Sequence, residues 1–249
     1  MFGKGNQTKP VQIETWVEEQ ALLADSIRKH AEGGRHLDIL EAGCGTRWDL
    51  GLKDVDYTLT GLDNDADALE IRQKKHQDID IAILGDLTNV SLEENAYDVI
   101  FSSYVLEHVE GAEQVLDRFR RWLKPNGIIV LRIPNRDSAK GFLTRVTPFW
   151  FHVLYKKYYE GVKDAGKPGH DPFPTPFDEV VSRSGIQAYC HRHGLKIMGE
   201  YNGGREYQKH RMRWIFSWML FWPISILSGG SITAKYAVMI YIIENTPRD

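Results

Sequence analysis

The stretch LDILEAGCGT, residues 37–46, is the feature that most constrains the fold of this chain. Its first four residues are mostly apolar and branched, which predicts a short buried strand. Gly43 and Gly45 follow, and they mark a point where the backbone turns sharply or approaches another group closely. A strand that ends in such a loop presents backbone N–H groups at the carboxyl edge of a sheet, where open α/β sheets bind their ligands. The rest of the sequence has to identify the ligand.

Strand and helix patterns alternate along the remainder of the chain. Strands are predicted at 37–40, 57–62, 79–84, 97–101, 127–133, 195–201 and 235–244. Helices are predicted at 11–32, from Asn64 or Asp65 to about Lys75, at 112–123, and from a capping box at Thr175, Pro176 and Asp178 to Gly194. This alternation predicts an α/β fold with a doubly wound, mostly parallel sheet of seven strands.

The pattern further predicts one domain over residues 1–249 with two insertions. An N-terminal helix occupies 10–34, and a ligand-binding core occupies 37–135. Aromatic insertions at 136–176 and 205–233 follow the fifth and sixth strands. In such a topology both insertions leave the sheet at the carboxyl edge, so we expect them to form a lid or to contact the substrate.

Composition excludes several classes of protein. The chain is 42% hydrophobic and 26% charged with a net charge of -3, which does not indicate a dedicated nucleic-acid binder. Two cysteines, Cys44 and Cys190, form neither a disulfide framework nor a metal-ligand set. We therefore expect the protein to reside in a reducing cytoplasm. The polar start MFGKGNQTKP does not resemble a signal peptide.

Acidic or small polar residues end the predicted strands, and their order indicates a ribose-bearing ligand. Glu41, Asp63, Asp86 and the pair Ser102-Ser103 occupy these ends. Asp63 lies 20 residues after Gly43, and a carboxylate at this position can accept hydrogen bonds from both ribose hydroxyls.

The residues around the glycines argue against a dinucleotide. A dinucleotide site uses a third glycine, but Thr46, Arg47 and Trp48 follow Gly45. An acidic residue before the loop, Glu41, suits an ammonium or sulfonium group better than a diphosphate.

Five segments, in order, resemble the motifs of class I S-adenosylmethionine-dependent methyltransferases of type 11, the broad group that includes the ubiquinone and menaquinone biosynthesis methyltransferases. The segments are ILEAGCGT, GLDND, LGDL, YDVIFSSYVLEHV and LKPNGIIVLRIPN. The resemblance covers 37–135 well, is weaker over 176–201 and 235–244, and is absent from the two insertions. It implies S-adenosylmethionine as the cofactor.

The resemblance also implies roles for individual residues along the core. The backbone around Gly43, Cys44 and Gly45 would hold the methionine part of the cofactor, with Glu41 near its amino end and Cys44 as a small packing residue. Asp63 would bind the ribose, Asn64 would flank the adenine, Asp86 would accept from the adenine amino group, and Leu87 would cover the ring. Ser103 and Tyr104 would lie near the methyl group.

A methyl acceptor that must lose a proton needs a base, and His108 is the candidate that the resemblance favours. The alternative is that His108 caps or orients the following segment, and Glu107 is expected to be structural. Further residues that could reach the acceptor are His152, His170, His210, Arg132, Asn135 and Arg136, although each histidine of this set has packing as its simpler role. No metal site is expected, because His170-Asp171 lacks ligand spacing.

The segment from Trp214 to Ile232 contains 19 uncharged residues, close to the length of a membrane span. Pro223 interrupts it and a predicted strand follows at once, which argues against a span. Three tryptophans at four-residue spacing follow basic residues, and this pattern favours contact with a membrane interface through 209–232. Packing on the protein's own core or on a homodimer partner is the alternative.

The sequence as a whole predicts an S-adenosylmethionine-dependent methyltransferase that acts on a small-molecule or lipid-linked acceptor. Oxygen is the favoured acceptor atom, with nitrogen and carbon open. The predicted location is the cytoplasm, including the inner face of a membrane. A non-catalytic, membrane-associated partner subunit that binds the same cofactor is the alternative, and a nicotinamide-dependent oxidoreductase is a more distant one.

Overall fold

The computed structural model describes residues 9–48, 50–167, 178–203, 226–228 and 236–246. Its strands are β1 (Val11–Gln12), β2 (Leu37–Ala42), β3 (Tyr57–Asp63), β4 (Ile81–Leu84), β5 (Tyr97–Ser103), β6 (Leu123–Pro134), β7 (Lys196–Gly203) and β8 (Val238–Glu244). Its α-helices are α1 (Trp16–His30), α2 (Ala66–Glu70), α3 (Ala112–Trp122), α4 (Ala139–Val146), α5 (Phe149–Leu154) and α6 (Arg183–His193). Two π-helical segments, η1 (Ile71–His76) and η3 (Tyr155–Glu160), continue α2 and α5, and η2 (Leu106–His108) is a 3₁₀ turn.

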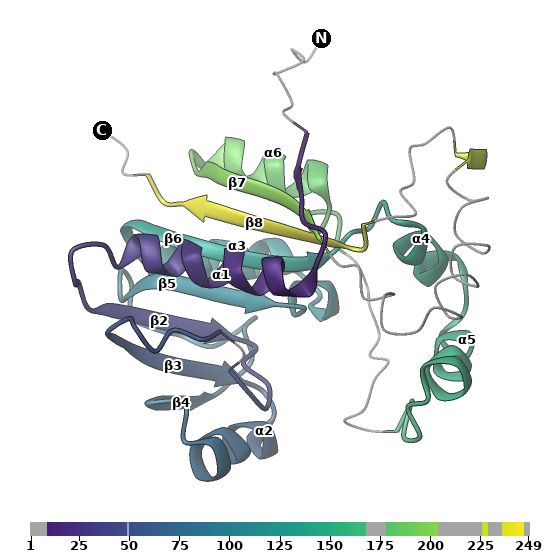
Figure 1. Ribbon diagram of the computed structural model, residues 1–249, viewed down its shortest axis with the longest axis horizontal. Helices are drawn as coiled ribbons and strands as arrows, with labels where there is room; N and C mark the ends of the chain where they lie inside the picture. Colours follow the sequence, from purple (N-terminus) through teal and green to yellow (C-terminus); the bar gives the residue numbers. More distant parts are fainter. Residues whose placement is uncertain (1–8, 49, 168–177, 204–225, 229–235, 247–249) are drawn as a thin grey trace.

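The strands form one mostly parallel sheet in the order β1-β7-β8-β6-β5-β2-β3-β4 (Figure 1). Only β8 runs antiparallel, against both β6 and β7. The predicted doubly wound α/β fold is therefore confirmed, but the described residues form eight strands and not seven. The additional strand, β1, pairs with Tyr201 and Asn202 at the edge of the sheet and lies within the stretch predicted as a helix.

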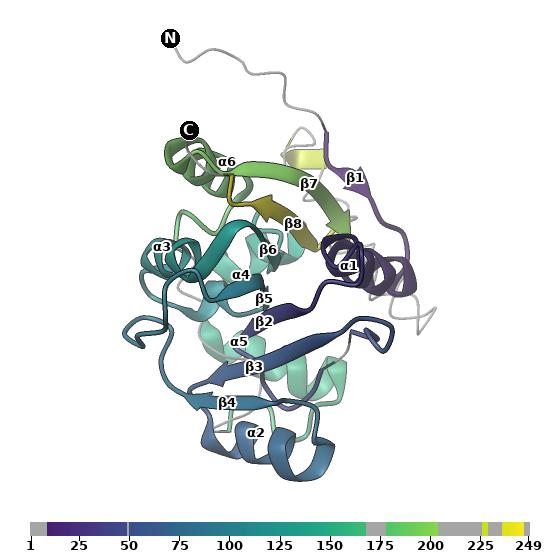
Figure 2. The same cartoon turned by 90° about the vertical axis from the view of Figure 1, so that its left-hand side faces the viewer.

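Helices cover both faces of the sheet, and Figure 2 shows α1 on one side with α3 and α6 on the other. The helix α1 packs Leu23 and Ile27 into one apolar cluster with strand residues such as Leu37. On the other face, Phe119 of α3 packs in a second cluster with Leu40 of β2. Because side chains alternate along a strand, β2 contributes to both cores.

Helix ends differ from the prediction at two places. The helix α1 begins only at Trp16, where Thr15 and Glu18 form a capping box, and Trp16 itself is exposed. The predicted start of α6 at Thr175 was wrong, because Ser182 caps the helix and accepts a hydrogen bond from the backbone N–H of Gly185 at 3.0 Å. Thr175 and Pro176 themselves lie outside the described residues. The predicted end at Gly194 is confirmed by its left-handed conformation.

The carboxyl edge of the sheet is where both insertions begin. Since β6 and β7 are each antiparallel to β8, they are parallel to one another, and the segments after them leave at the same edge. Figure 1 shows α4 and α5 beyond the arrowheads of β2, β3 and β5. Of the second insertion only 226–228 is described, so the predicted interfacial role of 209–232 stays a prediction. No helix in the part of the chain that the structure describes is long and apolar enough to cross a membrane.

Candidate functional site

The glycine loop after β2 is held close to its neighbours. The backbone N–H groups of Gly43 and Cys44 donate to the carbonyl oxygen of Leu62 at 2.8 and 3.1 Å. Gly43 has φ +75°, and a Cβ added there would overlap Cγ2 of Val105 and lie 2.9 Å from Cγ1. Gly45 also has a positive φ, but a Cβ there would meet no atom within 4 Å. The loop is therefore pressed against Val105 at its first glycine and open at its second.

A buried arginine holds this loop in place through hydrogen bonds and ion pairs. Arg72 of η1 is fully buried, and its guanidinium contacts three separate groups. Nη2 lies 2.9 Å from Oε2 of Glu41, Nη1 donates to the carbonyl oxygen of Cys44 at 2.8 Å, and Nε donates to Asp78 at 2.6 Å. Asp78 in turn accepts from the backbone N–H of Trp48 at 3.2 Å. Arg72 thus fixes both ends of the loop, which the sequence did not predict.

The two aspartates predicted for the ribose and adenine also organise backbone. Oδ2 of Asp63 accepts from the backbone N–H of Gly45 at 2.7 Å, and Oδ1 accepts from that of Asp65 at 3.0 Å. Asp86 accepts from the backbone N–H and the hydroxyl of Thr88, and these bonds hold the pKa of Asp86 below its ordinary value. Both carboxylates are therefore held in fixed positions at the carboxyl edge.

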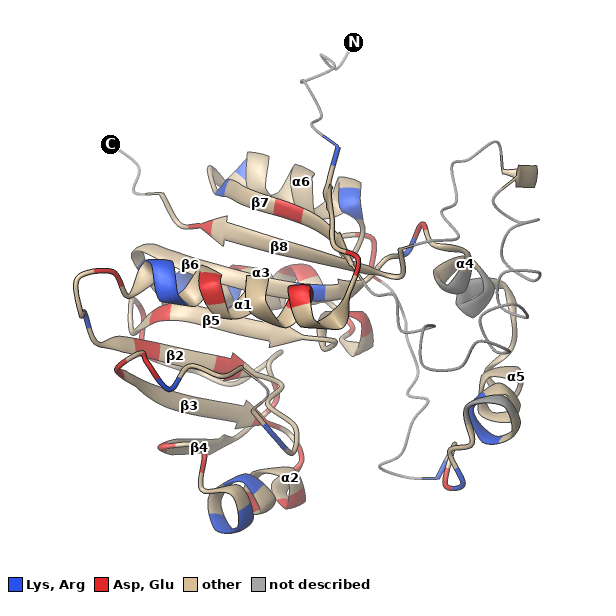
Figure 3. Ribbon diagram, in the orientation of Figure 1, with Lys and Arg blue, Asp and Glu red and all other residues tan. Residues whose placement is uncertain are grey.

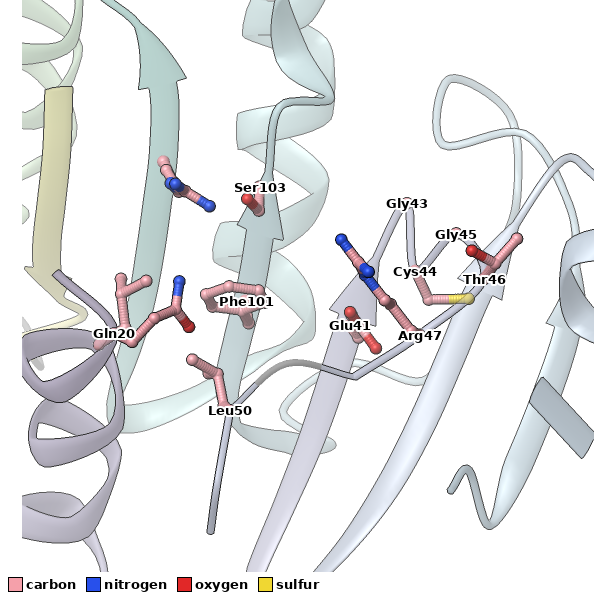
Figure 4. Close-up of a pocket in the computed structure, with 12 residues that line it drawn as sticks. Gln20, Glu41, Gly43, Cys44, Gly45, Thr46, Arg47, Leu50, Phe101 and Ser103 are labelled. Carbon is pink, nitrogen blue, oxygen red and sulfur yellow. The ribbon is translucent and has the colours of Figure 1, made fainter. Parts of the chain in front are cut away.

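A pocket of about 240 Å³ opens between this loop, α1 and the ends of β5 and β6. Figure 4 shows the loop on one side of it and Gln20 of α1 on the other. Its lining residues are Gln20, Leu23, Glu41, Gly43, Cys44, Gly45, Thr46, Arg47, Leu50, Phe101, Ser103 and Arg132. Five of them, Glu41, Gly43, Cys44, Gly45 and Ser103, were predicted as cofactor-binding residues from the sequence.

The side of the pocket formed by α1 carries polar groups that the sequence prediction missed. Oε1 of Gln20 is buried and has no hydrogen-bond partner in the structure. Arg132, which the sequence suggested only as a substrate contact, forms an ion pair with the buried Glu19 of α1. Its guanidinium also lies over the Tyr104 ring, 4.6 Å from the ring centre. A buried acceptor without a protein partner is open to a ligand that donates a hydrogen bond.

The remaining predicted residues lie at the same edge but do not line this pocket. Asp63, Asn64, Asp86, Leu87, Tyr104 and His108 are the residues concerned. Leu87 is buried in the apolar core, while Asn64 is exposed. The volume of about 240 Å³ is below the roughly 300–1,000 Å³ of a pocket for a whole drug-sized ligand, so the pocket matches one end of a ligand of nucleoside size.

Cys44 behaves as the packing residue that was predicted. Burial raises the pKa of its thiol to about 12, so the thiol is protonated at neutral pH and is not a nucleophile. Its sulfur lies close to Gly61 of β3, where an added Cβ would be only 3.1 Å away.

Glu107 and His108 differ in environment. Burial raises the pKa of Glu107 to about 8, and its Oε2 has no hydrogen-bond partner, so this side chain is a neutral buried acid. The ring of His108 is about one third exposed, and its Nε2 lies 3.9 Å from Oε1 of Glu107. The structural role predicted for Glu107 fits this burial, and the base role of His108 stays a prediction.

Four other acceptor candidates can be placed or set aside. Asn135 is occupied, because its side chain donates to the carbonyl oxygen of Tyr236 and accepts from the backbone N–H of Asp137. His152 forms a hydrogen bond with the Thr147 hydroxyl at 2.8 Å, which fits the packing role. His170 and His210 lie outside the described residues.

Comparison with known proteins matches the central part of the chain to one family. Residues 40–131 match the family model described as a methyltransferase domain. The match spans 92 of the 249 residues, and this part of the chain is similar to a methyltransferase domain. The matched region contains the second half of β2, all of β3 to β5 and most of β6, with the glycine loop and Arg72, so it covers the loop side of the pocket and excludes α1. The cofactor of this family is S-adenosylmethionine.

Three relatives support the match. A probable S-adenosylmethionine-dependent methyltransferase of Mycolicibacterium smegmatis is 32% identical over 48% of this chain and 46% of its own length. The ubiquinone biosynthesis O-methyltransferase of Rickettsia typhi is 26% identical over 75% of this chain and 72% of its own length. A hybrid PKS-NRPS synthetase of Penicillium citrinum is 24% identical over 66% of this chain, which spans only 5% of that protein.

Solved structures show the same fold. An S-adenosylmethionine-dependent methyltransferase from Mesorhizobium loti superposes with a TM-score of 0.52 at 15% identity, over 88% of this chain and 96% of the other. The [4+2]-cyclase SpnF superposes with a TM-score of 0.56 at 11% identity, over 98% and 86%. Because a cyclase shares the fold, the chemistry has to be argued from the site.

The pocket fits the methionine end of S-adenosylmethionine. That end carries an ammonium and a carboxylate. The unpartnered Oε1 of Gln20 and the carboxylate of Glu41 can accept from an ammonium. The guanidinium groups of Arg132 and Arg47 can face a carboxylate. Gly45 leaves open space over the loop for the chain between these groups.

Proposed function

We propose that the chain transfers the methyl group of S-adenosylmethionine to a small-molecule acceptor at the carboxyl edge of the sheet. The observation that carries the proposal is the pocket between the glycine loop and α1, which Gln20 lines with a buried Oε1 that has no hydrogen-bond partner. The bound cofactor would supply a methyl group on a sulfonium, whose sulfur leaves as a neutral thioether when the bond to the methyl group breaks. The protein therefore contributes mainly alignment and exclusion of water.

Different residues of the chain would hold different parts of the cofactor. The loop residues and Gln20 would hold the methionine end, and Asp63 would accept from the ribose hydroxyls. Asn64, Asp86 and Leu87 would hold the adenine. Ser103, which lines the pocket at the end of β5, would lie on the methyl side.

We further propose a lipid-linked acceptor methylated at oxygen. The relative from Rickettsia typhi is named an O-methyltransferase, and apolar residues are exposed on the insertion after β6. An oxygen acceptor must lose a proton, and His108 would accept it. A base role predicts that His108→Gln lowers kcat and flattens its rise with pH while the affinity for S-adenosylmethionine is retained.

A non-catalytic subunit that binds the cofactor is the second candidate. It is favoured by one observation, which is that no histidine lines the pocket formed by the described residues. The two candidates separate in one assay: incubation of the full chain with methyl-labelled S-adenosylmethionine and lipid and small-molecule extracts. Label in a product supports the enzyme, and cofactor binding without label in any extract supports the subunit.

Binding is tested by calorimetric titration of S-adenosylmethionine into the full chain and into Gln20→Leu and Asp63→Ala. We expect both variants to bind at least tenfold more weakly, since each loses a hydrogen bond to a charged or polar part of the ligand. The control is Asp54→Ala, which removes an exposed aspartate paired with Arg28. Normal binding by both site variants, with unchanged melting temperatures, would exclude the site assignment.

A further inference from the structure

The helical segment 149–160, formed by α5 and η3, has its apolar side turned outward. Trp150 is 62% exposed and Leu154 is 43% exposed, and Phe151 and Tyr158 are exposed as well. The four residues recur at one, three or four positions along the segment, so they lie on one face of a helix. Trp150 and Phe151 contact each other edge to face, with ring centres 6.1 Å apart.

This orientation is the reverse of that of the other amphipathic helices. In α3 the apolar residues Val115, Leu116 and Phe119 are buried against the sheet and the polar residues face outward. A surface helix normally follows the α3 pattern, and large exposed apolar patches mark interaction sites. The outward face of 149–160 is therefore without a partner among the described residues, and its exposure needs an explanation.

The inward face is anchored, which fixes which side is outward. Gly166 lies against Val153, since a Cβ added there would be 2.8 Å from Cγ1 of Val153. Ala165 is buried in the same turn. His152 is bonded to Thr147 at 2.8 Å. Rotation of the segment to bury Trp150 would break these contacts.

The positive charge of the region around this segment favours an anionic partner. Residues 139–163 contain five basic residues and one acidic residue, a net charge of +4. The whole chain carries -3, so the rest of it carries -7. Figure 3 shows basic residues on the segment at α5. Lys157 and Lys163 are exposed, and Lys157 lies 5.8 Å from the centre of the Tyr158 ring.

We propose that the segment 149–160 docks the protein on an anionic lipid bilayer. Aromatic side chains beside exposed lysines match the boundary between headgroups and acyl chains. A second copy of the chain is a poorer partner, because a symmetric contact through this face would place the same basic groups against each other.

Docking through this face would direct the carboxyl edge of the sheet toward the bilayer, because the segment lies beyond the strand ends (Figure 1). The inference deepens the proposed function, since it gives a lipid-linked acceptor a route to the pocket. Bilayer binding itself does not depend on catalysis, so the two proposals can fail separately.

The test is co-sedimentation of the full chain with vesicles of phosphatidylcholine and phosphatidylglycerol. We expect binding that rises with the phosphatidylglycerol fraction and falls with salt. The pair Lys157→Glu and Lys163→Glu should weaken the partition constant by about tenfold or more. The pair Trp150→Ala and Leu154→Ala should weaken the partition constant to a similar extent at low and at high phosphatidylglycerol fraction.

Matched controls use the same chemistry on other elements. Lys74→Glu with Lys75→Glu reverses an exposed lysine pair on η1, and Met198→Ala removes an exposed apolar side chain from β7. Both should bind vesicles as the unchanged chain does. S-adenosylmethionine binding and melting temperature verify that each variant is folded.

Two results would overturn the proposal. One is that the unchanged chain does not bind vesicles, or that the site variants and the control variants reduce binding equally. The other is a dimer in light scattering that Trp150→Ala with Leu154→Ala dissociates, which would assign the face to a second copy.

Discussion

Arg72 offers the sharpest test of how the glycine loop is held. Its side chain is fully buried, and its partner Glu41 is 6% exposed. Replacement by Met removes the charge while it keeps an unbranched side chain. Glu41 is then left as a buried carboxylate without this cation, and the loss of one member of a buried pair costs about 3–5 kcal/mol of the free energy of unfolding. Asp78 adds less, because its side chain is 25% exposed and can be hydrated.

The pH dependence of the stability loss in Arg72→Met follows from Glu41. In Arg72→Met the folded-state pKa of Glu41 should rise above its unfolded value, because burial disfavours the charged form. A raised folded pKa means that the folded state gains protons relative to the unfolded state. The stability loss should therefore be small near pH 4.5 and grow as pH rises to 7.5.

The assay is urea unfolding of the full chain and its variants at pH 5 and pH 7.5, with titration of S-adenosylmethionine in parallel. Arg72→Met should lose about 3–5 kcal/mol at pH 7.5 and bind the cofactor more weakly. Addition of Glu41→Gln to Arg72→Met should recover part of the stability, since the unpaired charge is removed. Arg28→Met is the control, because Arg28 contacts Asp54 in an exposed ion pair worth about 1 kcal/mol or less. A loss below about 1 kcal/mol, or one of equal size at both pH values, would refute the reasoning.

Three further outcomes are expected. Gly43→Ala should destabilise the protein by about 2–4 kcal/mol, and Gly33→Ala by about 1 kcal/mol, in thermal melts, because both have positive φ but only Gly43 meets Val105; equal losses would show that the contact is unimportant. Glu107→Gln should raise the free energy of unfolding at pH 7 by up to about 3 kcal/mol and leave it unchanged near pH 4.5, since a folded pKa of about 8 costs stability as pH rises above the unfolded value; a difference that does not change with pH would contradict this. Cys44 should resist alkylation by iodoacetamide in the folded state at pH 8 and react after unfolding in urea, and rapid labelling of the folded chain would contradict its burial.

The sequence predicted the parts of the site that depend on local pattern. Strand ends and glycines are visible as changes in periodicity, so the positions of Glu41, Gly43 and Ser103 at one edge could be foreseen. Their convergence follows from the parallel sheet alone. The eighth strand could not be foreseen in this way, because the two residues Val11 and Gln12 are too short to show an alternation.

The missed residues depend on contacts between distant segments. Arg72 lies in the run IRQKKH, which has the composition of a solvent-exposed helix face, and only the fold brings it 2.9 Å from Glu41. One signal was present, because an acidic residue inside a buried strand requires a cationic partner. Gln20 of α1 and Arg132 of β6 line the same pocket for a similar reason, and nothing in the periodicity of α1 distinguishes Gln20 from a surface residue.

The orientation of α5 shows a different limit of sequence patterns. Periodicity identified the apolar positions of α3, but such a pattern does not say whether an apolar face is turned toward a core. In α3 the face is buried, and in 149–160 it is exposed. The difference arises because residues 161–167 fold back on Val153 and cover the opposite side of the segment.

The charges around the pocket also explain why this glycine loop suits one nucleotide-like ligand and not another. Two buried ion pairs border it, Glu41 with Arg72 and Glu19 with Arg132, so among the charged residues that line the pocket only Arg47 lies outside these pairs. A diphosphate would bring uncompensated negative charge into this setting, and dinucleotide sites meet that charge with a helix N-terminus. Residues 43–48 and 50–56 contain no helix. The methionine end of S-adenosylmethionine carries an ammonium and a carboxylate that balance each other, so it can enter without a new unpaired charge. The nicotinamide alternative therefore fails at this loop on charge and backbone geometry together.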